Sequence, residues 1–194
     1  MSKKIFIWVA HPKAGSLCAA MADAYQSGAE REGATVKRMD LSNMEFELNF
    51  EGYSQDAPKL EPDLVRWQDA ISWADHLMFI HPYWWGTMPT KAKAVLDRAL
   101  TPGFAYKYHG KKVAWDKLLK GKTGDAVITS DTPPWLDTAL YRKPGRRVIK
   151  NQIFDFCGVK PKKIRQFGSV KLADEQRIEK WLGQTRDMGM KAAA

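Results

Sequence analysis

The chain has 194 residues, of which 44% are hydrophobic and 27% charged, and its formal net charge is +9. This length suits one domain whose hydrophobic core is stable without disulfide bonds or structural metal ions, and the composition is that of a soluble globular protein. No run approaches the roughly 20 apolar residues that span a bilayer, so we expect no stable membrane insertion.

The excess of positive charge is compatible with an anionic ligand, a nucleic acid or a solvated basic surface. Lysines and arginines are spread along the chain, and the densest groups, 142–150 and 160–165, lack the interleaved aromatics of a single-strand binder. We therefore predict no nucleic-acid partner. The four histidines show no metal-ligand spacing and the two cysteines form no CxxC, so no metal site is predicted. Without a targeting signal, the cytoplasm is the expected location.

Apolar periodicity predicts five strands that alternate with five helices. The expected strands cover residues 4–10, 35–39, 75–80, 123–130 and 163–170, and the expected helices cover 16–31, 62–74, 90–100, 148–156 and 178–185. We expect residues 42–60 to form a loop over the sheet edge, 104–122 an insertion rich in aromatic residues, and 189–194 a frayed tail. At the start of the insertion, 103–108 has neither strand nor helix periodicity. The alternation predicts an α/β fold over residues 1–194: a flavodoxin-like, doubly wound parallel sheet of order 2-1-3-4-5 with helices on both faces.

The most informative stretch is 81–89, which joins the third strand to the next helix and contains Tyr83, Trp84, Trp85 and Gly86. In an open α/β sheet, ligands bind at the carboxyl ends of the strands. Flat aromatic walls and a glycine that allows close backbone approach suit a planar heterocycle. The alternative is that Trp84 and Trp85 are ordinary core residues.

Two further loops, 11–18 and 129–135, are predicted to reach the same sheet edge. Ser16 begins a helix, so its hydroxyl and the amides of Leu17 and Cys18 suit a phosphate, with charge added by Lys13. The alternative for Ser16 is a plain N-cap. A helix N-terminus can also lower the pKa of a thiol, although a small apolar packing role is the favoured interpretation of Cys18.

An ordered set of motifs makes the sequence resemble the flavin-dependent NAD(P)H:quinone oxidoreductases, the relatives of mammalian DT-diaphorase and of the bacterial modulator-of-drug-activity proteins. The set comprises His11-Pro12-x-x-x-Ser16, His81-Pro82-Tyr83-Trp84-Trp85-Gly86-Thr87-Met88-Pro89, Lys93-x-x-x-Asp97-Arg98, Gly103-Phe104-Ala105-Tyr106-Lys107-Tyr108 and Leu118-Leu119-Lys120-Gly121-Lys122. Together these motifs extend over nearly the whole chain.

The resemblance implies non-covalent FMN or FAD, NAD(P)H as the electron donor, a quinone-type acceptor that alternates with NAD(P)H in one pocket, and a homodimer with sites at the subunit interface. The implied cofactor-binding residues are His11, Ser16, Leu17, Cys18, Pro82, Tyr83, Trp84, Trp85, Gly86, Thr129, Ser130 and Asp131. The implied pocket wall for the partner subunit is Phe104, Tyr106 and Tyr108. The candidate catalytic residues are Tyr106, Tyr108 and Tyr141.

One departure from the resemblance lies in the third loop, where the family often has a glycine pair and this chain has Asp131-Thr132-Pro133-Pro134. A carboxylate beside a flavin is unexpected. Two alternatives stay open: an azo-, nitro- or metal-ion reductase on the same scaffold, or a flavodoxin-like electron carrier or regulatory partner of a membrane transporter. The net charge of +9 counts against an electron carrier, because such carriers are typically acidic.

Overall fold

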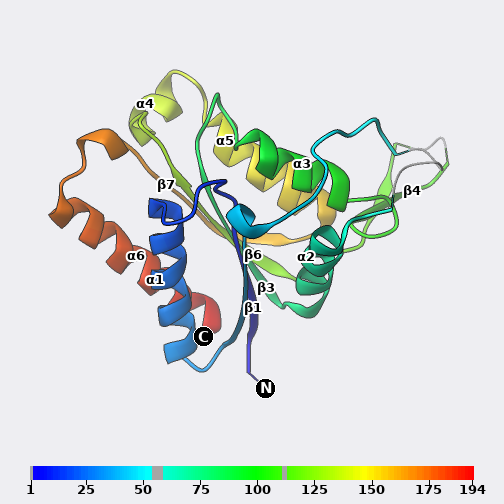
Figure 1. The fold of residues 1–194 in the computed structure, drawn as a ribbon, viewed down its shortest axis with the longest axis horizontal. Coiled ribbons are helices and arrows are strands. Elements are labelled where there is room, and N and C mark those ends of the chain that lie inside the picture. Colours follow the sequence, from blue (N-terminus) through cyan, green and yellow to red (C-terminus); the bar gives the residue numbers. More distant parts are fainter. Residues whose placement is uncertain (1, 54–58, 111–112) are drawn as a thin grey trace.

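The structure, a computed structural model, describes residues 2–53, 59–110 and 113–194 (Figure 1). A five-stranded sheet forms its centre, in the order β2-β1-β3-β6-β7, and every neighbouring pair is parallel. The strands are β1 (Lys4–Val9), β2 (Thr35–Asp40), β3 (His76–Pro82), β6 (Thr123–Thr129) and β7 (Lys160–Phe167). The predicted order is confirmed, although the fifth strand begins and ends three residues earlier than expected.

Helices cover both faces of the sheet (Figure 1). One face carries α1 (Leu17–Arg31) and α6 (Glu175–Ala193), which bury an apolar cluster that includes Met21, Tyr25 and Trp181. The other face carries α2 (Pro62–Trp73), α3 (Thr90–Ala99) and α5 (Pro144–Arg147), and α5 continues directly into the π-helical segment η2 (Val148–Asp155). Short helices η1 (Leu41–Asn43), α4 (Pro134–Ala139) and η3 (Val170–Leu172) lie in the connections.

Aromatic side chains fill the core between the sheet and α2. Trp8 contacts Trp67 edge to face at 5.3 Å between ring centroids, and it contacts Phe79 in the same way at 5.1 Å. Edge-to-face pairs of this kind stabilise a core beyond their buried area. Of the eight tryptophans in the sequence, Trp8 and Trp67 therefore serve packing rather than a binding site.

Three local predictions were wrong. Residues 104–122 include an antiparallel hairpin of β4 (Tyr106–Tyr108) and β5 (Trp115–Lys117), so the aromatic insertion does contain strands. Pro134 and Trp135 begin α4 instead of belonging to a loop. The tail is not frayed, because α6 continues to Ala193. The expected loop 42–60 has only the short helix η1 at its start, and 54–58 lie outside the described residues.

The termini of α6 and α1 show why the tail is ordered. A Cβ atom at Gly189 would collide with the backbone carbonyl of Tyr25, and one at Gly28 would collide with that of Arg186. The two glycines therefore let the helices approach backbone to backbone, so that α6 packs against α1 near its C-terminal end, where Met188 and Gly189 are buried. Within the described residues, no helix is long and apolar enough to cross a membrane.

Candidate functional site

The three predicted loops meet in one crevice of about 220 Å³ at the carboxyl ends of β1, β3 and β6. The residues that line it are His11, Leu17, Cys18, Pro82, Tyr83, Trp84, Thr129, Ser130, Asp131 and Val170. Nine of these ten were predicted from the sequence. The structure thus brings together side chains that are as much as 159 positions apart along the chain, from His11 to Val170.

The first loop delivers the N-terminus of α1 to the crevice. Ser16 is the N-cap, and its Oγ accepts a hydrogen bond from the amide of Ala19 at 3.3 Å. The amides of Leu17 and Cys18 lie in the first turn, where a helix provides no internal acceptor. No acidic residue stands in this turn, so it offers unopposed N–H donors to an anion.

His11 contributes a second donor. Its Nδ1 lies 3.0 Å from the amide nitrogen of Lys13, and because an amide can only donate, Nδ1 accepts. Burial lowers the pKa of His11 below its ordinary value, which keeps the ring neutral at pH 7. In a neutral ring the proton is then on Nε2, which becomes a hydrogen-bond donor. The ring also meets Trp84 edge to face, with centroids 5.7 Å apart.

The second loop makes a tight turn that presents two tryptophans. Trp84 and Thr87 exchange two backbone hydrogen bonds of 3.0 Å, and the residues between them, Trp85 and Gly86, have φ angles of 49° and 82°. Positive φ at both central positions defines a type I′ turn, which glycine adopts freely and tryptophan does not. The Trp85 side chain is fully exposed and that of Trp84 is 44% exposed, so the core alternative is wrong for both.

Tyr83 is held by a buried ion pair that the sequence did not reveal. Its hydroxyl donates to Oδ1 of Asp137 at 3.0 Å, and the guanidinium of Arg146 donates to Oδ2 at 2.9 Å. Burial, followed by this hydrogen bond to a carboxylate, raises the pKa of Tyr83 to about 12. A Cβ atom at Gly145 would collide with the Tyr83 ring, so this position requires glycine. These residues anchor the crevice loop to α4 and α5.

The third loop supplies hydroxyl groups and a carboxylate. Ser130 Oγ donates to the carbonyl of Thr132 at 2.7 Å and accepts from Nε2 of Gln166 at 2.9 Å. The unexpected carboxylate of Asp131 is held by Lys171, through its amide at 3.1 Å and through Nζ at 3.1 Å. Lys171 therefore offsets the negative charge at this edge of the crevice.

The side chain of Cys18 packs in the core, so that the backbone amide of this residue, and not its thiol, is available to a ligand. The Sγ atom lies 3.5 Å from Oγ1 of Thr129, and burial raises the pKa of the thiol to about 12. The helix N-terminus does not activate this cysteine, because desolvation of a thiolate outweighs the dipole. The interpretation of Cys18 as a small apolar packer is therefore the one that the structure supports.

Val170 lines the crevice without having been predicted. It follows Ser169, whose left-handed backbone (φ 61°) turns the chain after β7. The signal available in the sequence was topological: β7 is parallel to β6, so the loop after it must reach the same sheet edge. Its composition gave no further indication.

The remaining predicted residues lie elsewhere. Ser16, Trp85 and Gly86 adjoin the crevice along the chain but do not line it, and Tyr141 is 55% exposed between α4 and α5. The β4 hairpin lies beyond α2 and α3, away from α4 and the start of α1 (Figure 1). Tyr106 in this hairpin is only 8% exposed and meets Phe156 at 5.1 Å between ring centroids, whereas Tyr108 is 53% exposed.

Comparison with known proteins agrees with this architecture. The model of the Flavodoxin_2 family, described as a flavodoxin-like fold, matches residues 3–187. An uncharacterized NAD(P)H oxidoreductase of Haemophilus influenzae is 30% identical over 174 residues, which cover 86% of this chain and 84% of that protein. The crystal structure of Smu.1420 from Streptococcus mutans superposes with a TM-score of 0.84 at 28% identity, over 97% of this chain and 99% of that one.

A third similar protein is the NAD(P)H:quinone oxidoreductase of Methanothermobacter marburgensis, whose structure superposes with a TM-score of 0.80 at 25% identity and 98% coverage of both chains. The likeness thus extends over the whole sheet, both helical layers and the crevice. The chain belongs to the Flavodoxin_2 family of flavodoxin-like fold, alongside relatives named as NAD(P)H and quinone oxidoreductases.

Proposed function

We propose that this protein is a flavin-dependent NAD(P)H:quinone oxidoreductase that binds FMN or FAD non-covalently in the crevice. The observation that carries the proposal is the convergence of three loops with complementary chemistry: unopposed helix N-terminal amides and a neutral histidine donor on the first, exposed tryptophans on the second, and hydroxyl groups on the third. The names of the similar proteins from Haemophilus influenzae and Methanothermobacter marburgensis support the same activity.

The donors in the crevice suit the two ends of a flavin. The amides of Leu17 and Cys18 and the Nε2–H of His11 would hold the phosphate side, since each offers a proton and none brings negative charge. The turn at Trp84 and Trp85 would border the ring system. When bound, a flavin supplies two-electron chemistry, taking a hydride from NAD(P)H and passing it to an acceptor; the protein supplies binding, orientation and electrostatics.

Anchoring of the loops would keep this geometry fixed. The ion pair of Asp137 and Arg146 restrains Tyr83, and Gln166 restrains Ser130, so two of the three loops are tied to helices and strands behind them. A site that changes shape little on binding loses less conformational entropy, which favours affinity. The ion pair with Lys171 would offset the negative charge of the Asp131 carboxylate beside a bound flavin.

We also propose a homodimer in which Tyr108 and Phe104 complete the crevice of the partner subunit. Tyr108 is half exposed, and its hairpin lies far from the crevice of its own chain (Figure 1). An exposed aromatic on a protruding hairpin favours a role in an interface. A twofold dimer would repeat this contact at both sites.

Purification, a visible spectrum and the mass of the released cofactor test the proposal. We expect a yellow protein that releases intact FMN or FAD on denaturation and oxidises NADH or NADPH with a quinone. Double-reciprocal plots at several quinone concentrations should be parallel, as for two substrates that use one pocket in turn. A colourless protein that also takes up neither added FMN nor added FAD would contradict the flavin proposal. A yellow protein that does not reduce quinones would support the proposed flavin cofactor and contradict the proposed quinone acceptor.

A further inference from the structure

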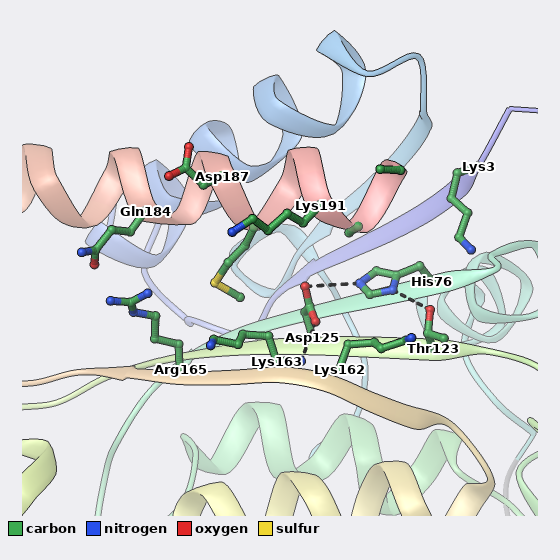
Figure 2. Close-up of a pocket in the computed structure, with 13 residues that line it drawn as sticks. Lys3, His76, Thr123, Asp125, Lys162, Lys163, Arg165, Gln184, Asp187 and Lys191 are labelled. Atoms are coloured by element: carbon green, nitrogen blue, oxygen red, sulfur yellow. Dashed lines mark hydrogen bonds and ion pairs between the residues drawn. The ribbon is translucent and has the colours of Figure 1, made fainter.

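A second cavity, of about 450 Å³, lies at the opposite ends of the strands (Figure 2). Its walls include Lys3, just before β1, His76 at the start of β3 and Thr123 at the start of β6, and α6 covers it. The crevice stands at the other end of β6, about 20 Å away for a strand of this length at about 3.3 Å per residue. No residue lines both cavities.

Five cationic side chains converge on this cavity, which we call the basic cavity. They are Lys3, Lys162, Lys163, Arg165 and Lys191. Across the described parts of the chain, none of these five takes part in an ion pair. Figure 2 shows Lys163 and Arg165 on β7 facing Lys191 on α6. Several like charges around one concave space repel one another, so an anion bound among them would be stabilised.

The carboxylates of the wall do not balance these cations. Asp125 is 4% exposed, and its oxygens accept hydrogen bonds from the amide of Lys163 at 2.8 Å and the hydroxyl of Tyr25 at 3.2 Å. His76, whose Nε2 lies 3.6 Å from Asp125, belongs to the same buried network. The remaining side-chain carboxylate is Asp187 on α6. The basic cavity therefore keeps a surplus of positive charge, with five cationic side chains against the carboxylates of Asp125 and Asp187.

A β-bulge directs two consecutive lysines into the basic cavity. Pro161 pairs with Gly124 and Lys163 pairs with Asp125, so Lys162 is an extra residue in β7. In a regular strand, successive side chains point to opposite faces, yet Lys162 and Lys163 line the same cavity. Bulges occur next to functional sites because they re-aim side chains in this way.

We propose that the basic cavity binds a small anion that carries two or more phosphate groups. Its volume lies within the roughly 300–1,000 Å³ of small-molecule sites. The cations surround a concave space instead of forming a stripe, and among its described lining residues the only aromatic ring is the imidazole of His76, which is buried and hydrogen-bonded to Tyr25 and Thr123. Without a stacking platform, single-stranded nucleic acid is disfavoured, whereas phosphate groups need only positive charge and N–H donors.

Calorimetric titration of the whole protein with pyrophosphate and with tripolyphosphate, at constant ionic strength, tests this assignment. The variant Lys163→Gln/Lys191→Gln removes two facing cations, both exposed and without ion pairs, so the fold should be kept. The matched control Lys120→Gln/Lys150→Gln removes the same charge from exposed positions outside the cavity. We expect saturable binding to the wild type and the control, with the dissociation constant raised about tenfold or more in the cavity variant.

Flavin content serves as an internal readout, because the crevice lies at the other strand ends and should be unaffected by either double variant. The assignment would be overturned by the absence of saturable binding, by equal weakening in both variants, or by tighter binding of a single-stranded RNA oligonucleotide than of tripolyphosphate. If circular dichroism shows that the double variant is unfolded, Lys191→Ala alone, on the exposed edge of α6, replaces it and must still weaken binding.

Discussion

Trp85 combines full exposure with a left-handed backbone, and both features are unfavourable for an isolated tryptophan. Strained residues of this kind persist where the surrounding structure fixes them, and they gather at binding sites. We expect Trp85→Ala to weaken flavin binding by roughly 1–3 kcal/mol, by analogy with the stacking of bases on aromatic side chains. Fluorescence titration of the apoprotein with FMN and FAD measures the effect.

Trp73→Ala is the matched control for this experiment. Trp73 ends α2, and the Nζ of Lys37 lies 4.5 Å from its ring centroid on the far side of the molecule from the crevice loops. Its loss should lower stability and leave flavin affinity unchanged. Equal affinity in the wild type and in Trp85→Ala would show that the exposed tryptophan does not border the flavin.

His81 makes the folding stability depend on pH. Burial lowers its pKa from 6.5 to about 4, and its Nε2 has no hydrogen-bond partner among the described residues, whereas Nδ1 lies 2.8 Å from the carbonyl of Pro82. Below pH 6.5 the unfolded chain takes up a proton that the folded chain takes up only near pH 4. Stability should therefore fall as the pH falls from 6.5 to 4, by about 3 kcal/mol over the full interval.

Urea unfolding at several pH values between 7 and 4 measures this loss. In His81→Leu the dependence on pH over this interval should become shallower, because the variant has no imidazole to protonate. His109→Gln is the control, since His109 is half exposed on the hairpin. An unchanged slope in His81→Leu would mean that other groups cause the acid sensitivity.

At the scale of elements, the contact between α1 and α6 depends on two glycines. We expect Gly189→Ala to lower the free energy of unfolding by about 1–3 kcal/mol, because the new methyl group would collide with the backbone carbonyl of Tyr25 and push the helices apart. Gly183→Ala, in the same helix, has no heavy atom within 4 Å of the added carbon and should instead raise stability by up to about 1 kcal/mol. Chemical denaturation of both variants distinguishes packing from helix propensity, and destabilisation of the same size in both would contradict the close-packing argument.

At the scale of the whole molecule, the proposed dimer makes the β4 hairpin part of the neighbouring site. Tyr108→Ala should raise the Michaelis constants for both NAD(P)H and the quinone, since both would use the same pocket in turn, and it should leave flavin content nearly unchanged. Tyr108→Phe keeps the ring and should retain most of the affinity for both. Replacement of Tyr106 is a poorer test, because its ring is packed against Phe156 in its own subunit.

Sedimentation of the wild type at micromolar concentration tests the assembly directly. We expect a dimer, with the aromatic wall supplied across the interface. A monomer with full quinone reductase activity would exclude the hairpin as part of the site, whatever the kinetics of Tyr108→Ala.

The sequence by itself determined the sheet order and the position of the crevice. Buried parallel strands are continuous apolar runs such as 77–80, whereas helices have apolar residues that recur every three to four positions. The alternation of the two element types is compatible with few topologies. Because the carboxyl ends of parallel strands share one edge, the three loops could be predicted to meet without knowledge of any contact.

The tertiary structure decided what depends on partners distant in sequence. No local sequence pattern encodes the contacts that produce four features of the structure. They are the restraint of Tyr83 by Asp137, the burial of Tyr106, the ordering of α6 against α1, and the direction in which the Lys162 side chain points. A tyrosine has the same intrinsic preferences whether it faces Phe156 or solvent, and a bulge exists only relative to the neighbouring strand. Local hydrophobicity thus specified the layers of this protein, whereas side-chain packing between the layers determined which polar groups line the crevice and the basic cavity.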